Sequence, residues 1–421
     1  MPTSTLPSLR FVSMPSIQVG FANAQGLELA GRLDLPSGPA RAIALFAHCF
    51  SCSKDLLAAG RIAQALNDEG FGVLRFDFAG LGKSAGNFSD TNFSSNVDDL
   101  VAAAAWLREH HSAPAVLVGH SLGGAAVVAA AHRLPEVRAV ATIGAPSNVE
   151  HVLDHFADQL ATIENEGEAN VLLAGRPFRI TRQFLDDARE QDIRAAVHTL
   201  GRPLLVMHAP GDTVVGIDNA AALYAAARHP KSFIGIDGAD HLLTTAADAR
   251  FAGSMIAAWA SRYVERGAEP PPAPAVGILI TESGVSRLQN WVVAANRRPL
   301  LADEPARVGG SDTGYGPFQW VAIGLAACTS MTLRLYADGK QMPLEHVEVA
   351  VTHSKRPAPP LDREATTAAG TIDVFDLTVR VRGSLEAEAL SRLEAIANRC
   401  PVHKLLAPGG LVQIVAFERM P

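Results

Sequence analysis

The sequence predicts an α/β domain, with a mostly parallel sheet covered by helices, followed by a smaller α+β domain. Three observations support this. Short apolar runs alternate with helical patterns over residues 15–266. Residues 276–421 instead combine period-two strands with long helices. Between them, residues 267–275 include the run GAEPPPAP, which favours an extended linker rather than a helix or a sheet strand.

Within the first domain, the apolar runs predict buried strands and the segments between them predict helices. Residues 150–200 are more polar, fit no strand and predict an inserted helical lid, a common place for substrate selection. The predicted strands are 42–47, 73–77, 115–120, 139–144, 203–208 and 232–237, and the clearest helices are 55–70 and 96–111.

The second domain begins with a predicted hairpin of residues 276–281 and 288–294. Residues 317–337 form one long helical pattern that is apolar nearly all round, which implies burial in a core or an interface. Period-two alternation predicts strands at 345–353 and 375–383, and residues 385–399 predict an amphipathic helix.

Composition excludes several classes of protein. The 421 residues are 48% apolar and 19% charged, an ordinary globular mixture, and the net charge of −7 argues against nucleic-acid partners. Four cysteines are too few for a disulfide scaffold. The sequence contains no apolar run of about 18 residues, so no membrane span is predicted. Residues 1–14 lack the apolar core of a signal peptide and are expected to form a disordered leader, so we expect a cytoplasmic protein.

The strongest motif is Gly-His-Ser-Leu-Gly at residues 119–123, between an apolar strand and a helix of small residues. Only small residues fit beside such a tight turn, and the turn raises the Ser121 hydroxyl above the sheet at a helix N-terminus. A serine needs a base, and the base needs an orienting acid. The candidates are His241 and Asp212, which follow later strands in the order expected for this architecture.

The alternatives to these assignments are ordinary structural roles. Asp212 could be a turn residue, Asp237 and Asp240 are nearby rivals for the acid, and His241 could be a packing histidine. Cys49 and Cys52 form a C-x-x-C pair without a thioredoxin-like context or a second pair of zinc ligands, so no metal is expected. We interpret them as small structural thiols, with an oxidation-sensitive role as the alternative.

The first domain resembles the α/β-hydrolase fold over nearly its full length. RFDFAGLGKSAG at 75–86 is similar to a segment that follows the fold's fourth strand, and HCFS at 48–51 occupies the place of a His-Gly-x motif. The resemblance implies that the amides of Phe50 and Leu122 form the oxyanion hole. It also implies a serine hydrolase that needs no cofactor. Small carboxylic esters are the expected substrates, and amides, thioesters and lactones remain open.

The second domain resembles the OsmC/Ohr family of thiol-dependent organic hydroperoxide reductases. The similarity lies in LADEPARVGGSDTGYGPF at 301–318, in the cysteine-bearing helix and in CPVHKLL at 400–406. It implies that Cys328 is the thiol that attacks the peroxide and that Cys400 is the resolving thiol. A dithiol reductant would then return both cysteines to free thiols. An arginine would hold the thiolate, with Arg287 as the first candidate and Arg298 as the second. Gln319 replaces the glutamate that would orient this arginine.

The family's dimers, with sites at the subunit interface, imply a homodimer through this second domain. Three functions therefore remain open for the chain. The first is a serine esterase with an appended dimerisation or redox domain. The second is a thiol peroxidase, alone or as a second activity beside the esterase. In the third, the second domain serves only dimerisation or oxidation sensing, which the glutamine at position 319 favours.

Overall fold

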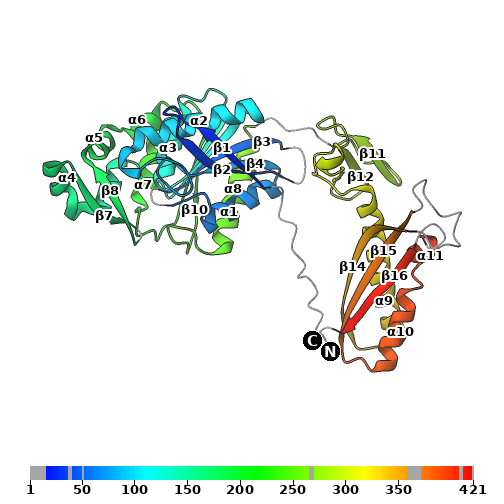
Figure 1. Ribbon diagram of the computed structural model, residues 1–421. Helices are drawn as coiled ribbons and strands as arrows, with labels where there is room; N and C mark the ends of the chain where they lie inside the picture. The colour runs from blue at the N-terminus through cyan, green and yellow to red at the C-terminus, as the bar shows by residue number, and fades with distance from the viewer. Residues whose placement is uncertain are drawn as a thin grey trace. The chain divides into compact units, whose positions relative to one another are not determined.

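The computed structural model describes residues 16–36, 40–49, 52–173, 175–264, 270–357, 371–406 and 411–419. The chain divides into two compact units (Figure 1). Unit 1 contains the residues up to Pro272 together with Ser283–Val285, and unit 2 contains Ala273–Glu282 and the chain from Ser286. The predicted leader, and residues 267–269 of the predicted linker, lie outside the described residues.

Unit 1 is built on a sheet of eight strands in the order β1-β2-β4-β3-β5-β6-β9-β10. The strands from β4 to β10 run parallel, and β1 and β2 add an antiparallel edge. The six predicted apolar strands are all present. The strands are β1 (Ser16–Ala22), β2 (Glu28–Asp34), β3 (Ala42–Ala47), β4 (Phe71–Phe76), β5 (Pro114–His120), β6 (Ala139–Ile143), β9 (Leu204–His208) and β10 (Lys231–Gly235).

Helices cover both faces of this sheet, which explains why its central strands are apolar on both sides (Figure 1). α1 and α8 pack together on one face, while α2, α3 and α7 contribute to the core on the other. These elements are α1 (Leu57–Asp68), η1 (Phe88–Asp90), α2 (Phe93–His110), α3 (Leu122–Ala131), α7 (Asp218–Ala226) and α8 (Ala246–Ala260).

The lid between β6 and β9 is not wholly helical, so the prediction that residues 150–200 contain no strand is wrong. A β7–β8 hairpin lies among the helices, seen in green in Figure 1. It buries Val171, Leu173 and Ile180, but each strand is too short for this alternation to stand out. The lid elements are η2 (Val149–Gln159), α4 (Leu160–Glu166), β7 (Glu168–Leu173), β8 (Arg176–Thr181), α5 (Arg182–Glu190) and α6 (Ile193–His198).

Unit 2 has the predicted hairpin, extended to a three-stranded sheet, and a second three-stranded sheet that packs against helices. In the second sheet β14 pairs antiparallel and β16 pairs parallel with the central β15. The elements are β11 (Ile278–Glu282), β12 (Asn290–Ala294), β13 (Leu300–Ala302), η3 (Ala306–Val308), α9 (Pro317–Gly339), β14 (Leu344–Pro357), β15 (Thr371–Gly383), α10 (Ala387–Ala397), α11 (Pro401–Leu406) and β16 (Leu411–Arg419).

The long apolar helix α9 buries only one stripe of side chains. Four residues spaced four apart, namely Leu325, Thr329, Leu333 and Ala337, are fully buried. By length and composition alone α9 could cross a membrane, but this stripe packs in the cores shared with β15. Other large apolar side chains stay exposed, including Met331 at 65% and Leu335 at 73%. Within unit 2 the helix therefore has a core face and an apolar outer face.

Candidate active site

Ser121 lies in a strained turn, and close backbone contacts at the neighbouring glycines fix the path of the chain there. Ser121 connects β5 to α3 with a φ of +55°, a conformation that is rare outside glycine. A Cβ added at Gly119 would lie 2.2 Å from the carbonyl oxygen of Gly123, and one added at Gly123 would lie 2.4 Å from that of His48. The two glycines are thus required by close backbone approach, and the turn is fixed by the Ser121 N–H donating to Ile143 at 2.8 Å.

The structure brings Ser121, His241 and Asp212 together in one hydrogen-bonded chain. His241 Nε2 lies 3.1 Å from Ser121 Oγ, and His241 Nδ1 lies 2.7 Å from Asp212 Oδ2. The side chains of His241 and Asp212 are 8% and 1% exposed. This pattern of partners places the imidazole proton on Nδ1 and leaves Nε2 to accept from the serine hydroxyl.

Asp212 is held as a carboxylate by its surroundings. Burial pushes the pKa of this carboxyl up, but hydrogen bonds from His241 and from two backbone N–H groups outweigh burial, and its pKa lies below the ordinary value. The two N–H groups belong to Val214 and Val215 and donate to Oδ1 at 2.8 and 2.9 Å. The rival Asp240 is engaged elsewhere, because it accepts from the N–H and the hydroxyl of Thr244.

His120, which precedes the serine, is a positioning residue that the sequence did not point to. It is buried, and its Nε2 donates to the carbonyl oxygen of His241 at 2.7 Å. Burial lowers the pKa of His120 to about 4, so the ring is neutral near pH 7. Its partner is a backbone carbonyl 121 residues away, which no sequence pattern reveals. His120 thus connects the strand end at Ser121 to the loop that carries His241.

Gly144, directly after β6, is a second residue that the sequence did not point to. Its φ is +55°, and a Cβ there would lie 3.4 Å from both Asp212 Oδ2 and His241 Nδ1. A Cβ there would make only ordinary van der Waals contact with the two side chains, so it is the left-handed backbone conformation that favours glycine at this position. A glycine immediately after a buried strand was the only signal for it in the sequence.

The loop after β3 carries the predicted oxyanion donor. Phe50 lies outside the described residues, whereas Leu122 is the first residue of α3, where an N–H has no partner within the helix. The expectation of free thiols in this loop is wrong, because Cys49 and Cys52 are joined by a disulfide. Their Cα atoms are 5.2 Å apart, and the N–H of Cys52 donates to the carbonyl of Cys49.

A buried ion pair holds the chain that follows this loop. Lys54 is anchored twice to the fully buried Asp77, through its backbone N–H and through Nζ, each at 2.6 Å. The backbone N–H of Lys83 also donates to Asp77 at 2.9 Å. Residues 77–83 therefore hold in place the chain that directly follows the loop after β3.

In unit 2 the two predicted cysteines belong to one apolar cluster. Cys400 is fully buried, Cys328 is half-buried, and both are free thiols. The sulfur of Cys400 lies 3.4 Å from the hydroxyl of Thr329 and accepts from the N–H of His403 at 3.3 Å. Burial lowers the pKa of His403, so this imidazole favours its neutral form.

The other residues predicted for this cysteine site form no hydrogen bond with the two thiols among the described residues. Gln319 accepts from the N–H of Gly316 at 2.7 Å and so caps the start of α9. Arg287 and Arg298 are exposed, and within the described part of unit 2 neither forms a hydrogen bond or an ion pair with Cys328 or Cys400. Among the residues that the structure describes, the two candidate arginines therefore do not pair with the two thiols.

Comparison with known proteins decides the family. The esterase domain of a Rhodothermus marinus protein is 50% identical and is covered completely, over 60% of this chain, with a TM-score of 0.51. The chain belongs to the α/β-hydrolase family. Within this α/β hydrolase, residues 38–167 match the family model described as serine aminopeptidase, S33. Residues 309–414 match the model of the OsmC-like proteins. The predicted fold class and both resemblances are confirmed.

More distant relatives of this α/β hydrolase match between about half and three-fifths of its chain. The uncharacterized protein YfhR of Escherichia coli O157:H7 is 27% identical over 229 residues, which is 53% of this chain and 72% of YfhR. A hypothetical protein of Pseudomonas aeruginosa is 19% identical, with a TM-score of 0.51 over 60% of this chain and 95% of that chain. The latter likeness shows the shared fold.

Proposed function

We propose that unit 1 hydrolyses small carboxylic esters with Ser121 as the nucleophile. The supporting observation is the hydrogen-bonded chain from Ser121 Oγ through His241 to Asp212, at a strained strand–helix turn. The relative at 50% identity is described as an esterase domain. An ester suits this arrangement because its alcohol can leave once a single proton is supplied by the histidine.

The acylation step follows from the proton positions. Ser121 Oγ attacks the ester carbonyl carbon while His241 Nε2 takes the hydroxyl proton, and the carbonyl electron pair moves onto the oxygen. The N–H of Leu122, the first of α3, would donate a hydrogen bond to this oxyanion. The N–H of Phe50 is the second donor that the family resemblance implies. The oxyanion then collapses, the bond to the alkoxy oxygen breaks, and His241 gives its proton to the leaving alcohol.

Deacylation repeats these steps with water. His241 takes a proton from a water molecule that attacks the acyl-enzyme, and the proton then passes to Ser121 Oγ as the acid leaves. Asp212 stays ionised throughout, in keeping with its lowered pKa, and stabilises the transient imidazolium. The hydrogen bond from His120 to the His241 backbone holds the base within reach of Ser121 Oγ and of the attacking water.

Hydrolysis of a series of short p-nitrophenyl esters tests the proposal, with Ser121→Ala as the paired variant. We expect the variant to lose about 10⁴-fold or more in kcat, as a triad acts as one unit. The chain-length profile of the wild type would measure the acyl pocket. An inactive wild type on every ester, or a variant that keeps its rate, would contradict the proposal.

A second activity is proposed for unit 2, namely reduction of organic hydroperoxides by a dithiol. The supporting observation is that Cys328 and Cys400 are free and pack in the same cluster. The Cys328 thiolate attacks the peroxide oxygen, which releases an alcohol and leaves a sulfenic acid. Cys400 displaces water from it to form a disulfide, and an external dithiol reduces that disulfide and is itself oxidised.

The apolar outer face of α9 supports a homodimer as the working form for this chemistry. A face with Met331 and Leu335 this exposed is unfavourable in water, and a second copy could cover it and bring an arginine to Cys328. Cumene hydroperoxide consumption with a dithiol tests the activity, with Cys328→Ser as variant and Ser121→Ala as control. Equal consumption by wild type and Cys328→Ser would leave unit 2 without this role.

A further inference from the structure

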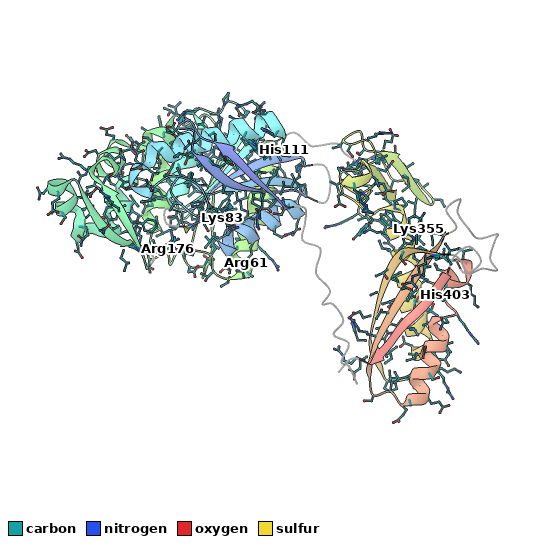
Figure 2. The ribbon with its side chains drawn as sticks, in the orientation of Figure 1. Arg61, Lys83, His111, Arg176, Lys355 and His403 are labelled. Atoms are coloured by element: carbon teal, nitrogen blue, oxygen red, sulfur yellow. A yellow bond between two sulfur atoms is a disulfide. The ribbon has the colours of Figure 1, made fainter. Side chains whose placement is uncertain are left out.

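An arginine-lined pocket lies in unit 1, and none of its lining residues belongs to the triad. It has a volume of about 360 Å³, within the size range of small-molecule sites. It lies against the start of α1, and Figure 2 shows one of its arginines, Arg61, at the surface of unit 1. The lining residues are Arg32, Asp55, Leu56, Leu57, Gly60, Arg61, Gln64, Arg75 and Arg250.

The lining carries four guanidinium groups and one carboxylate, in a chain whose net charge is −7. One of the four is neutralised within the protein, because Arg75 donates through Nε and Nη2 to Asp34 at 2.9 and 2.7 Å. Its third nitrogen donates to the carbonyl of Lys54. The hydrogen-bond donors of Arg75 are therefore satisfied within the protein, and the excess positive charge of the pocket comes from the other three arginines.

Arg32 has an incomplete set of partners. It lies directly opposite Arg75 on the neighbouring strand, where two like charges repel each other. Its nearest carboxylate, on Asp55, is 4.0 Å away and is shared with Lys54 at 3.5 Å. Its Nε is buried and has no hydrogen-bond partner among the described residues. A buried N–H donor without an acceptor is costly, so this guanidinium favours an external anion.

The remaining two arginines add donors from two helices. Arg61 uses Nη1 to donate to the carbonyl of Thr244 at 2.8 Å, and a carbonyl does not neutralise its charge. Arg250 is exposed, and it forms no side-chain hydrogen bond or ion pair with any other residue that the structure describes. Apart from Arg75, the pocket thus presents three guanidinium groups against the single carboxylate of Asp55, which Arg32 shares with Lys54.

We propose that this pocket binds a phosphate-type oxyanion, either inorganic phosphate or the phosphate group of an ester. Arginine binds phosphate through paired N–H donors in a planar fork, and three such groups suit its several acceptor oxygens. Leu57, which is 71% exposed in the lining, offers an apolar contact to the organic part of an ester. The site is independent of the proposed esterase chemistry, since none of its residues belongs to the triad.

The test measures binding of inorganic phosphate to the full chain by isothermal titration calorimetry, in chloride buffer of matched ionic strength. Arg250→Gln is the main variant because this side chain is exposed, and Arg32→Gln is the second. Arg194→Gln removes the same charge from an exposed position in α6 outside the pocket and is the control. A second arm uses sedimentation with vesicles of phosphatidylcholine, with and without phosphatidic acid.

We expect saturable phosphate binding that weakens about tenfold or more in each pocket variant, as for loss of a charge-assisted bidentate contact, and is unchanged in the control. Sedimentation only with phosphatidic acid vesicles, lost in the pocket variants, would support a lipid headgroup as the source of the phosphate. Absence of binding in both arms would overturn the proposal. So would binding that all three variants retain, or an equal loss in Arg194→Gln.

Discussion

Replacement of His120 by glutamine tests the electrostatic account of the site. The glutamine amide keeps a donor for the carbonyl of His241 but does not titrate. In the wild type, burial lowers the pKa of His120 from 6.5 to about 4. As pH falls below about 6.5, the unfolded chain therefore takes up a proton that the folded chain cannot accept until about pH 4. The stability associated with neutral His120 is present above about pH 6.5 and is lost as pH falls.

The magnitude follows from the two pKa values. Between about pH 7 and pH 5 this single group lowers the free energy of unfolding by about 2 kcal/mol. Over the whole interval from 6.5 to about 4 the loss approaches 3 kcal/mol, at about 1.4 kcal/mol for each pH unit. His120→Gln should lack this component. Other buried histidines, such as His48, whose pKa burial also lowers, remain in both proteins, and their contribution cancels in the comparison.

The assay must follow unit 1 separately from unit 2. Urea titrations read by a short hydrogen-exchange pulse achieve this, because mass spectrometry can follow peptides from β5 alone. The exposed His132, changed to glutamine, is the control and should behave as the wild type. Equal loss of stability in wild type and His120→Gln between about pH 7 and pH 5 would refute the assignment of the lowered pKa to His120.

Three further changes test the site by other routes. Asp212→Asn should lower kcat on p-nitrophenyl esters by about 10⁴-fold, whereas Asp240→Asn should lower it less than about tenfold; a reversed order would reassign the acid. Lys54→Met leaves the buried Asp77 carboxylate without its ion-pair partner and should reduce the free energy of unfolding by about 3 kcal/mol or more. The same urea titrations with a hydrogen-exchange pulse measure this, and the exposed Lys83→Met should change the stability little. Gly123→Ala meets the His48 carbonyl at 2.4 Å and should lower kcat/KM more than about tenfold; Gly216→Ala, which has open space, should keep its activity.

The sequence predicted the parts of the fold whose burial is continuous. The parallel strands of unit 1 are apolar on both faces, so each appears as an unbroken run. The edge strand β1 buries only Phe21 among its seven residues, and such a strand resembles a loop in composition. The lid hairpin escaped prediction for a related reason, because its buried residues are few and are separated by exposed ones.

Some features of the candidate site could likewise be predicted from the sequence, and others could not. The positions of Ser121, Asp212 and His241 after three of the parallel strands were informative because parallel strands end at one edge of the sheet. The partners that fix these residues were not predictable. His120 acts through a backbone carbonyl, and Lys54 pairs with Asp77 across 23 residues without a spacing rule. Contacts of that kind depend on the three-dimensional path of the chain rather than on residue type.

The positive φ of Ser121 has an evolutionary consequence. At +55° a serine is strained and a glycine is not, so the residue that performs the proposed chemistry is one that folding alone would not select. Function and stability therefore favour different residues at this position. In a descendant released from the need for hydrolysis, glycine is the replacement at position 121 that relaxation of the fold would favour. Retention of serine in this conformation is what the proposed hydrolysis requires.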